Sequence, residues 1–188
     1  MSLRGALAWL PNLITLARLL AVPVTVYLLL IGSYDAAFWL FIAAGVSDAL
    51  DGIVAKHFNA TSEVGAFLDP LADKALLVAV YVTLGYLEHI AVWLVILIVF
   101  RDLLIIGGAI LFHTLTQSLR MEPLLVSKTN TVAQIVLACT VLAELGLELS
   151  LAGAVHVLVY VVAATTFVSG AAYVIKWGRR AVTMERDT

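Results

Sequence analysis

The sequence predicts an all-α integral membrane protein with six transmembrane helices and a short N-terminal interfacial segment. Of its 188 residues, 63% are hydrophobic and only 13% are charged, whereas soluble domains usually carry about a quarter charged residues. The apolar residues gather in runs of about 20, the length that crosses the hydrocarbon core of a bilayer. The helical core of a soluble protein is the alternative, and it accounts poorly for so few charges. We expect residues 1–188 to form one domain.

The apolar runs are separated by charged residues, glycine or proline. Short connections at 32–35, 87–90 and 148–151 indicate that the helices they join are antiparallel neighbours. Two longer connections, at 58–67 and 114–127, lie on the opposite side. The six spans are expected at residues 12–31, 36–57, 68–86, 91–113, 128–147 and 152–177.

Local features shape the ends and the course of these spans. Residues 3–10, with Arg4 and Trp9, are expected either to lie in the membrane interface as a short amphipathic helix or to be an untethered terminus. Pro23 lies inside the first span and is expected to kink it, because proline removes a backbone hydrogen bond. Pro70 is expected in the first turn of the third span, where proline is tolerated.

The basic residues indicate an orientation. None of the 11 Lys and Arg residues lies in the three short connections, which carry acidic residues instead. Because basic residues favour the cytoplasmic side, the termini and the two longer connections are expected in the cytoplasm. The protein is expected in a bacterial inner membrane. A basic cluster ends the last span and is expected to attract anionic membrane lipids; it consists of Lys176, Arg179 and Arg180. We expect no nucleic-acid partner.

Aspartates cluster at the cytoplasmic ends of the second and third spans. Asp48 and Asp51 are three residues apart, and Asp69 and Asp73 are four apart, so each pair shares one face of a helix. The connection between the two spans is short enough for the pairs to converge. So much unpaired negative charge in a poor dielectric is strongly unfavourable. A hard divalent cation, Mg²⁺ or Mn²⁺, would remove that penalty, because such metals prefer oxygen ligands.

Two alternatives compete with a metal-dependent enzyme. The acids would form buried ion pairs with Lys56, Lys74 and Arg101, or they would be the ion site of a metal transporter. A transporter site normally lies near the bilayer midplane on broken helices, whereas these acids lie at helix ends. A non-catalytic scaffold is also disfavoured, because all four acids are present.

The whole pattern, Asp-x2-Asp-Gly-x2-Ala-Lys-x8-Gly-x3-Asp-x3-Asp over residues 48–73, resembles the signature of the CDP-alcohol phosphatidyltransferases, integral membrane enzymes of phospholipid synthesis. The resemblance implies six transmembrane helices, a homodimer and a cytoplasm-facing active site. It also implies a reaction in which a hydroxyl attacks a CDP-linked lipid or alcohol and CMP leaves. Lys56 stands where the family usually has arginine, so the charge is kept but the bidentate fork is lost.

The resemblance assigns roles by position. Asp48, Asp51 and Asp69 are expected metal ligands. Asp73 is the expected catalytic residue, as ligand of a second metal ion or as general base on the acceptor hydroxyl. The CDP site is expected to consist of Asp48, Asp51, Gly52, Ala55, Lys56, Gly65 and Asp69.

The acceptor alcohol is indicated by residues outside the signature. Residues 10–18 resemble the first helix of two branches that use CDP-diacylglycerol, the phosphatidylglycerophosphate synthases with glycerol-3-phosphate and the single-domain cardiolipin synthases with phosphatidylglycerol. Ala109 and Asn130 stand where the glycerophosphate type carries arginine and lysine. Because two cations suited to a phosphate dianion are missing, we favour the cardiolipin synthase branch. Glycerol-3-phosphate is the alternative acceptor, and inositol phosphate or serine stays open.

Arg101, Lys128, Asn130 and Arg18 are the candidates for the acceptor or lipid-phosphate pocket. Arg101 lies near mid-span, where an unpaired charge costs at least about 2.5–3.5 kcal/mol, and a pair with its neighbour Asp102 is the alternative. Asn130 is expected to bind acceptor hydroxyls or to hydrogen-bond between helices. Arg18 is expected to reach a phosphate or to snorkel to the interface.

Overall fold

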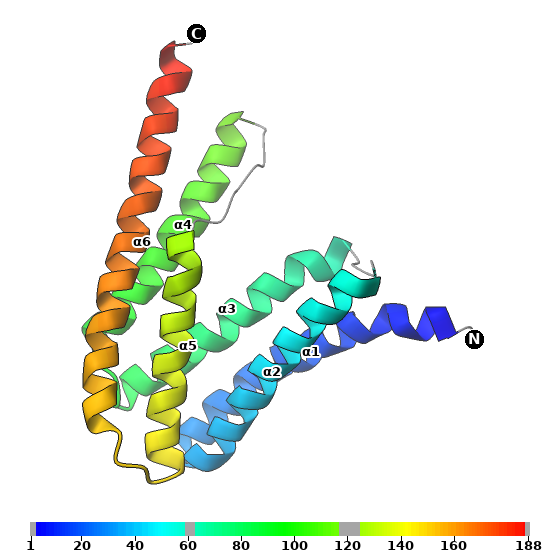
Figure 1. The fold of residues 1–188 in the computed structure, drawn as a ribbon, viewed down its shortest axis with the longest axis vertical. Helices are drawn as coiled ribbons and strands as arrows, with labels where there is room; N and C mark the ends of the chain where they lie inside the picture. The colour runs from blue at the N-terminus through cyan, green and yellow to red at the C-terminus, as the bar shows by residue number, and fades with distance from the viewer. Residues whose placement is uncertain (1–2, 59–62, 117–124, 187–188) are drawn as a thin grey trace. The chain divides into compact units, whose positions relative to one another are not determined.

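The computed structural model of the chain consists of α-helices joined by short connections (Figure 1). It describes residues 3–58, 63–116 and 125–186, and within them the side chains of residues 16–47, 74–108 and 125–178. The described residues contain no strand, so the all-α prediction is confirmed for them. The helices are α1 Leu3–Leu30, α2 Tyr34–Phe58, α3 Glu63–Tyr86, α4 Val92–Thr116, α5 Leu125–Gly146 and α6 Ala152–Arg186.

Each predicted span corresponds to one helix, but several helix ends differ from the prediction. Residues 3–10 form the first turns of α1 and are not a separate segment, and Pro23 does not interrupt that helix. The third helix begins at Glu63, so the prediction that Pro70 lies in its first turn was wrong. The apolar pattern marks only the stretch that suits the hydrocarbon core, whereas backbone hydrogen bonding continues into the polar ends.

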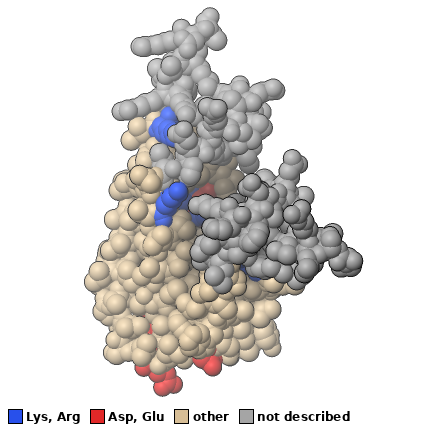
Figure 2. All heavy atoms as spheres, turned by 45° about the vertical axis from the view of Figure 1, so that its right-hand side comes forward, with Lys and Arg blue, Asp and Glu red and all other residues tan. Residues whose placement is uncertain are grey.

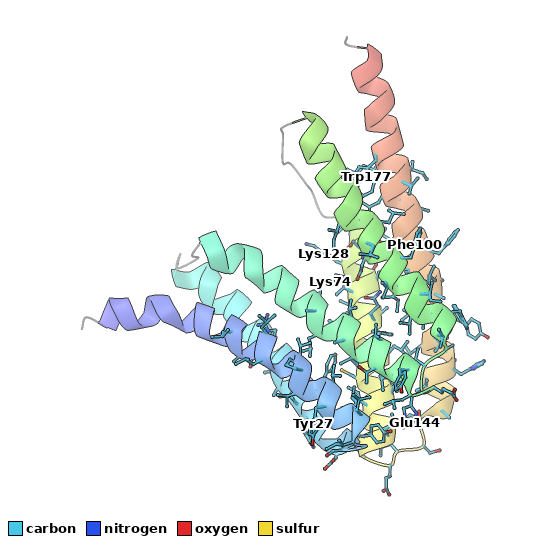
Figure 3. All side chains as sticks on the ribbon, turned by 180° about the vertical axis from the view of Figure 1, so that it is seen from behind. Tyr27, Lys74, Phe100, Lys128, Glu144 and Trp177 are labelled. Carbon is cyan, nitrogen blue, oxygen red and sulfur yellow. The ribbon has the colours of Figure 1, made fainter. Side chains whose placement is uncertain are left out.

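Among the residues whose side chains are described, two helices are long and apolar enough to cross a membrane, over Leu125–Gly146 and Ala152–Gly178. The other apolar helical stretches described are shorter, so the six predicted spans are not established. Large apolar side chains nevertheless lie exposed on α4, at Trp93, Ile96 and Phe100; Phe100 is labelled in Figure 3. Their spacing of three and four residues places them on one helix face, as expected of a face in contact with lipid or another apolar surface.

The chain divides into two compact units, and unit 1 comprises Met1–His89 and Ala138–Leu151. In it α1 packs against both α2 and α3, around the fully buried Leu29 and Leu84. Gly146 allows the end of α5 to pack closely against the start of α2. An added Cβ at this position would lie only 2.7 Å from the backbone oxygen of Tyr34.

The turns at one end of unit 1 carry its exposed acids. Gly32 ends α1 with a φ of +76°, the left-handed conformation that glycine adopts without a steric penalty. The Tyr34 hydroxyl and His89 Nε2 lie 3.0 Å apart in a hydrogen bond that joins the α1–α2 turn to the turn after α3. Figure 2 shows acidic side chains at the lower end of the visible face. The sequence assigns three acids to these turns and their flanks, Asp35, Glu88 and Glu148.

Unit 2 comprises Ile90–Leu137 and Ala152–Thr188. Its helices α4 and α6 pack side by side (Figure 1), with Leu94, Ile98 and Val162 fully buried. Gly108 lies directly opposite the ring of Trp177, where any Cβ would overlap the indole. The glycine therefore permits the close approach of α4 and α6 at this level.

Candidate active site and a buried polar cluster

The predicted metal ligands lie on two helices. Asp48 and Asp51 belong to α2, and Asp69 and Asp73 belong to α3. The helical spacing assumed for each pair is therefore confirmed for the backbone. Their side chains lie outside the described residues, as do those predicted for the CDP site, so their roles stay predictions. Four carboxylates at helical spacing form a donor set that suits Mg²⁺ or Mn²⁺.

The described side chains offer no second metal site. Among them, no group of three or more His, Cys, Asp or Glu residues could hold a metal ion; the side chains of the signature aspartates are not among the described ones. The metal that the signature implies is expected on the aspartates of α2 and α3, whose side chains lie outside the described residues.

Arg101 of α4 is buried, with 3% of its surface exposed, and it joins three helices. Its Nη1 donates to Asp102 Oδ1 at 2.7 Å, and its Nη2 donates to Ser127 Oγ of α5 at 2.7 Å. Its Nε donates to Ser169 Oγ of α6 at 3.2 Å, and Nη2 also contacts that oxygen. Gly170 of α6 lies beside the side-chain stem of Arg101, and an added Cβ would be in ordinary contact with its Cγ at 3.6 Å.

Arg101 forms an ion pair with Asp102, which was the alternative to a role in binding the acceptor phosphate. The contact with Asp102 is a buried salt bridge at 2.7 Å, and Asp102 has a further interaction of its own. An isolated cation inside an apolar bundle is costly, and a paired one far less so. The prediction that Arg101 binds an acceptor phosphate is not tested by this geometry, but most of its N–H groups already have protein partners.

Asn130 of α5 is fully buried and hydrogen-bonded to α6. Its Oδ1 accepts from the Thr166 hydroxyl at 2.8 Å and from the Thr165 hydroxyl at 2.9 Å. Its amide nitrogen, Nδ2, has no hydrogen-bond partner among the described residues. The oxygen of the Asn130 amide thus makes the expected hydrogen bonds between helices. Its nitrogen is a buried donor without a described partner.

These residues form one cluster, which we call the polar seam. Ser127 and Asn130 are three apart on α5, and Thr166 and Ser169 are three apart on α6, so each pair shares a helix face. Ser127 and Ser169 both accept hydrogen bonds from Arg101 of α4, and Asn130 accepts one from Thr166. The two helix faces therefore point toward each other. The polar seam consists of Arg101, Asp102, Ser127, Asn130, Thr165, Thr166 and Ser169.

The other two predicted acceptor residues lie elsewhere. Lys128, labelled in Figure 3, is exposed on α5 next to Ser127 and makes no hydrogen bond or ion pair with the described residues of the polar seam. Arg18 of α1 belongs to unit 1, is 4% exposed and has an interaction partner. Its burial disfavours the alternative in which it snorkels into water. The phosphate-binding roles of both residues stay predictions.

Sequence reasoning missed the α6 side of the polar seam. Thr165, Thr166 and Ser169 interrupt the longest apolar run of the chain. Hydroxyl residues at three-residue spacing in such a run indicate a face that packs against other polar groups. The signal was present, but serine and threonine are tolerated in membrane helices and do not name their partners.

The sequence profile of the CDP-alcohol phosphatidyltransferases matches residues 8–174. The chain is 31% identical to the cardiolipin synthase (CMP-forming) of Homo sapiens, over 95% of this chain and 64% of that protein. It is 33% identical to a cardiolipin synthase (CMP-forming) / mitochondrial hydrolase fusion protein of Schizosaccharomyces pombe, over 92% of this chain and 32% of that one.

A relative of the other branch is equally similar. A chloroplastic CDP-diacylglycerol–glycerol-3-phosphate 3-phosphatidyltransferase of Oryza sativa is 34% identical over 89% of this chain and 56% of its own length. The chain thus spans between about a third and two thirds of the length of these relatives. Overall identity does not separate the two acceptors.

Proposed function

The chain belongs to the CDP-alcohol phosphatidyltransferase family, and we propose that it transfers a phosphatidyl group from CDP-diacylglycerol to an alcohol with release of CMP. One observation carries this proposal: the family match covers residues 8–174 and includes the complete set of signature aspartates on α2 and α3. A metal or ion transporter, the other interpretation of those acids, gains no support from the match.

The proposed chemistry assigns a task to each part of the signature. Asp73 accepts the proton of the acceptor hydroxyl, whose oxygen then forms a bond to the β-phosphorus of the donor. The bond from that phosphorus to the bridging oxygen breaks, and CMP leaves. Gly52 and Gly65 let the nucleotide approach the backbone, and Lys56 places a positive charge near its phosphates. Mg²⁺ or Mn²⁺, two ions held by the four aspartates, would polarise the phosphate and stabilise the leaving CMP.

Phosphatidylglycerol is the proposed acceptor, which makes the product cardiolipin. Ala109 and Asn130 stand in place of two cations that would bind a free phosphate dianion in the glycerophosphate type. The charge of Arg101 is already balanced by Asp102. An acceptor phosphodiester carries a single negative charge and needs fewer cations. Glycerol-3-phosphate remains the alternative acceptor, because relatives named for that reaction are equally similar.

We further propose a homodimer that spans a bacterial inner membrane six times, with termini and active site in the cytoplasm. Two apolar helices of spanning length support the membrane location. The acidic turns of unit 1 support the orientation, because they lack the basic residues that mark cytoplasmic loops.

The proposal is tested with the purified full-length protein in detergent. CMP release from CDP-diacylglycerol is measured with phosphatidylglycerol and glycerol-3-phosphate offered separately, with Mg²⁺ or Mn²⁺ and then with EDTA. We expect metal-dependent release with phosphatidylglycerol and its loss on chelation. No release by folded protein with either acceptor would refute the activity, and product from glycerol-3-phosphate alone would overturn the acceptor.

A further inference from the structure

Helix α6 supplies partners for the one predicted acceptor residue that is both buried and uncharged, Asn130. Thr166 is fully buried, and its hydroxyl makes a single described hydrogen bond, to Asn130 Oδ1 at 2.8 Å. Thr165 lies at 2.9 Å from the same oxygen but also has the carbonyls of Val161 and Val162 within its own helix. Only the Thr166 hydroxyl is therefore committed to Asn130.

This commitment fixes which way the amide faces. The structure assigns the carbonyl oxygen of Asn130 to the side of Thr166, whose hydroxyl donates to it at 2.8 Å. The NH₂ group then faces away from Thr166. It lies inside the bundle without a hydrogen-bond partner among the described residues.

A buried donor without a partner is uncommon in native proteins and destabilising. A ligand oxygen placed against Asn130 Nδ2 would remove that penalty. The neighbouring charge does not compete for such a ligand, because Arg101 is paired with Asp102 at 2.7 Å. The polar seam therefore offers a neutral donor, which suits a hydroxyl or ester oxygen better than a phosphate dianion.

We propose that Thr166 is a positioning residue of the acceptor site: it orients the Asn130 amide so that its NH₂ group donates to an uncharged oxygen of the acceptor alcohol. This inference rests on the proposed function and adds a specificity role for α6. It predicts that loss of the Thr166 hydroxyl lets the amide turn over, which would present an oxygen where the acceptor needs a donor.

The test compares Thr166→Val with Thr166→Ser and with a matched control, Thr25→Val. Thr25 is equally buried, but its hydroxyl donates to Ala21 O within its own helix at 2.8 Å. Affinity for phosphatidylglycerol is measured in detergent from the shift in thermal unfolding with lipid concentration, with phosphatidylcholine as the reference lipid. Initial rates are then measured against each substrate in turn.

We expect Thr166→Val to weaken phosphatidylglycerol binding and to raise its KM by about five- to tenfold, the usual effect of one hydrogen bond. The kcat and the KM for CDP-diacylglycerol should stay unchanged. Thr166→Ser, which keeps the hydroxyl, should restore both acceptor values, and Thr25→Val should match the unmodified protein.

Two failures remain distinguishable. Absence of CMP release by the unmodified protein would contradict the proposed function, while the lipid-affinity comparison would still be measured. Unchanged lipid affinity in Thr166→Val, or a loss that Thr166→Ser does not restore, would overturn the role of Thr166 whatever the activity. If Thr166→Val lowers kcat and donor affinity as much as it lowers acceptor affinity, the role of Thr166 is merely structural. That result would also overturn the proposal.

Discussion

The aspartate signature and the polar seam deal with charge in an apolar protein in opposite ways. In residues 48–73 four aspartates and Glu63 accompany a single lysine, Lys56, so the segment cannot balance its own charge. In the polar seam, Arg101 is balanced by Asp102 at 2.7 Å and by hydroxyls from two further helices. Unbalanced charge calls for a ligand from outside, whereas balanced charge joins helices.

This contrast separates two uses of buried polar groups. An ion pair with its own counter-charge contributes geometry and becomes harmful only when one partner is lost. A set of like charges is harmful until a cation arrives. Variants in the signature should therefore change the reaction rate, and variants of the Arg101–Asp102 pair should change stability; either result can break that distinction.

The largest effect is expected for Asp73→Asn in the signature. Loss of a general base typically lowers a rate by about 10²- to 10⁴-fold, so CMP release should nearly vanish while CDP-diacylglycerol binding is largely kept. Release is measured at saturating substrates and donor binding by thermal shift. Glu63→Gln, an acid on the same helix at an unconstrained position of the pattern, is the control and should keep its activity. Near-normal turnover of Asp73→Asn would remove Asp73 as the base.

A smaller effect, on stability, is expected for Asp102→Asn in the polar seam. Removing one partner of a buried ion pair costs about 3–5 kcal/mol, so the unfolding midpoint in detergent should fall sharply. Replacing both Arg101→Met and Asp102→Leu should recover most of the loss, because no lone charge is left. The exposed Glu148→Gln is the control, with a change within about 0.5 kcal/mol. An equally mild Asp102→Asn would show that Asp102 does not balance Arg101.

The smallest effect is expected for Lys56→Arg, which restores the residue usual in the family. Arginine keeps the charge and adds a bidentate fork, so the KM for CDP-diacylglycerol should fall by roughly two- to threefold without a change in kcat. Kinetics with the donor varied provide the measurement, and Lys176→Arg on α6 is the control. A higher KM would mean that Lys56 fits its site as a point charge.

The all-helical architecture and the helical spacing of the aspartates could be predicted from the sequence because they depend on local patterns. Apolar runs indicate helices, and spacings of three and four residues keep their meaning in any α-helix. The start of α3 at Glu63 could not be found this way, because a polar helix end resembles a loop in composition.

The partners within the polar seam depend on tertiary contacts and were beyond a sequence pattern. Arg101 had a phosphate or Asp102 as possible partners, and only the packing of α4 on α6 brings Ser169 to its Nε. For Asn130 the sequence left a ligand role and an interhelical role open. The structure gives one end of the amide to α6 and leaves the nitrogen without a described partner.

The close contact of Gly108 with Trp177 has a mechanical consequence. Arg101 and Ser169 join α4 to α6 at one level, and Gly108 and Trp177 meet about two helical turns further along both helices. Two contacts at different heights restrain both sliding and rotation of α4 against α6. A single contact would leave rotation about that point free. A bulkier residue at position 108 would thus act as a wedge, and its displacement would be felt at the guanidinium two turns away.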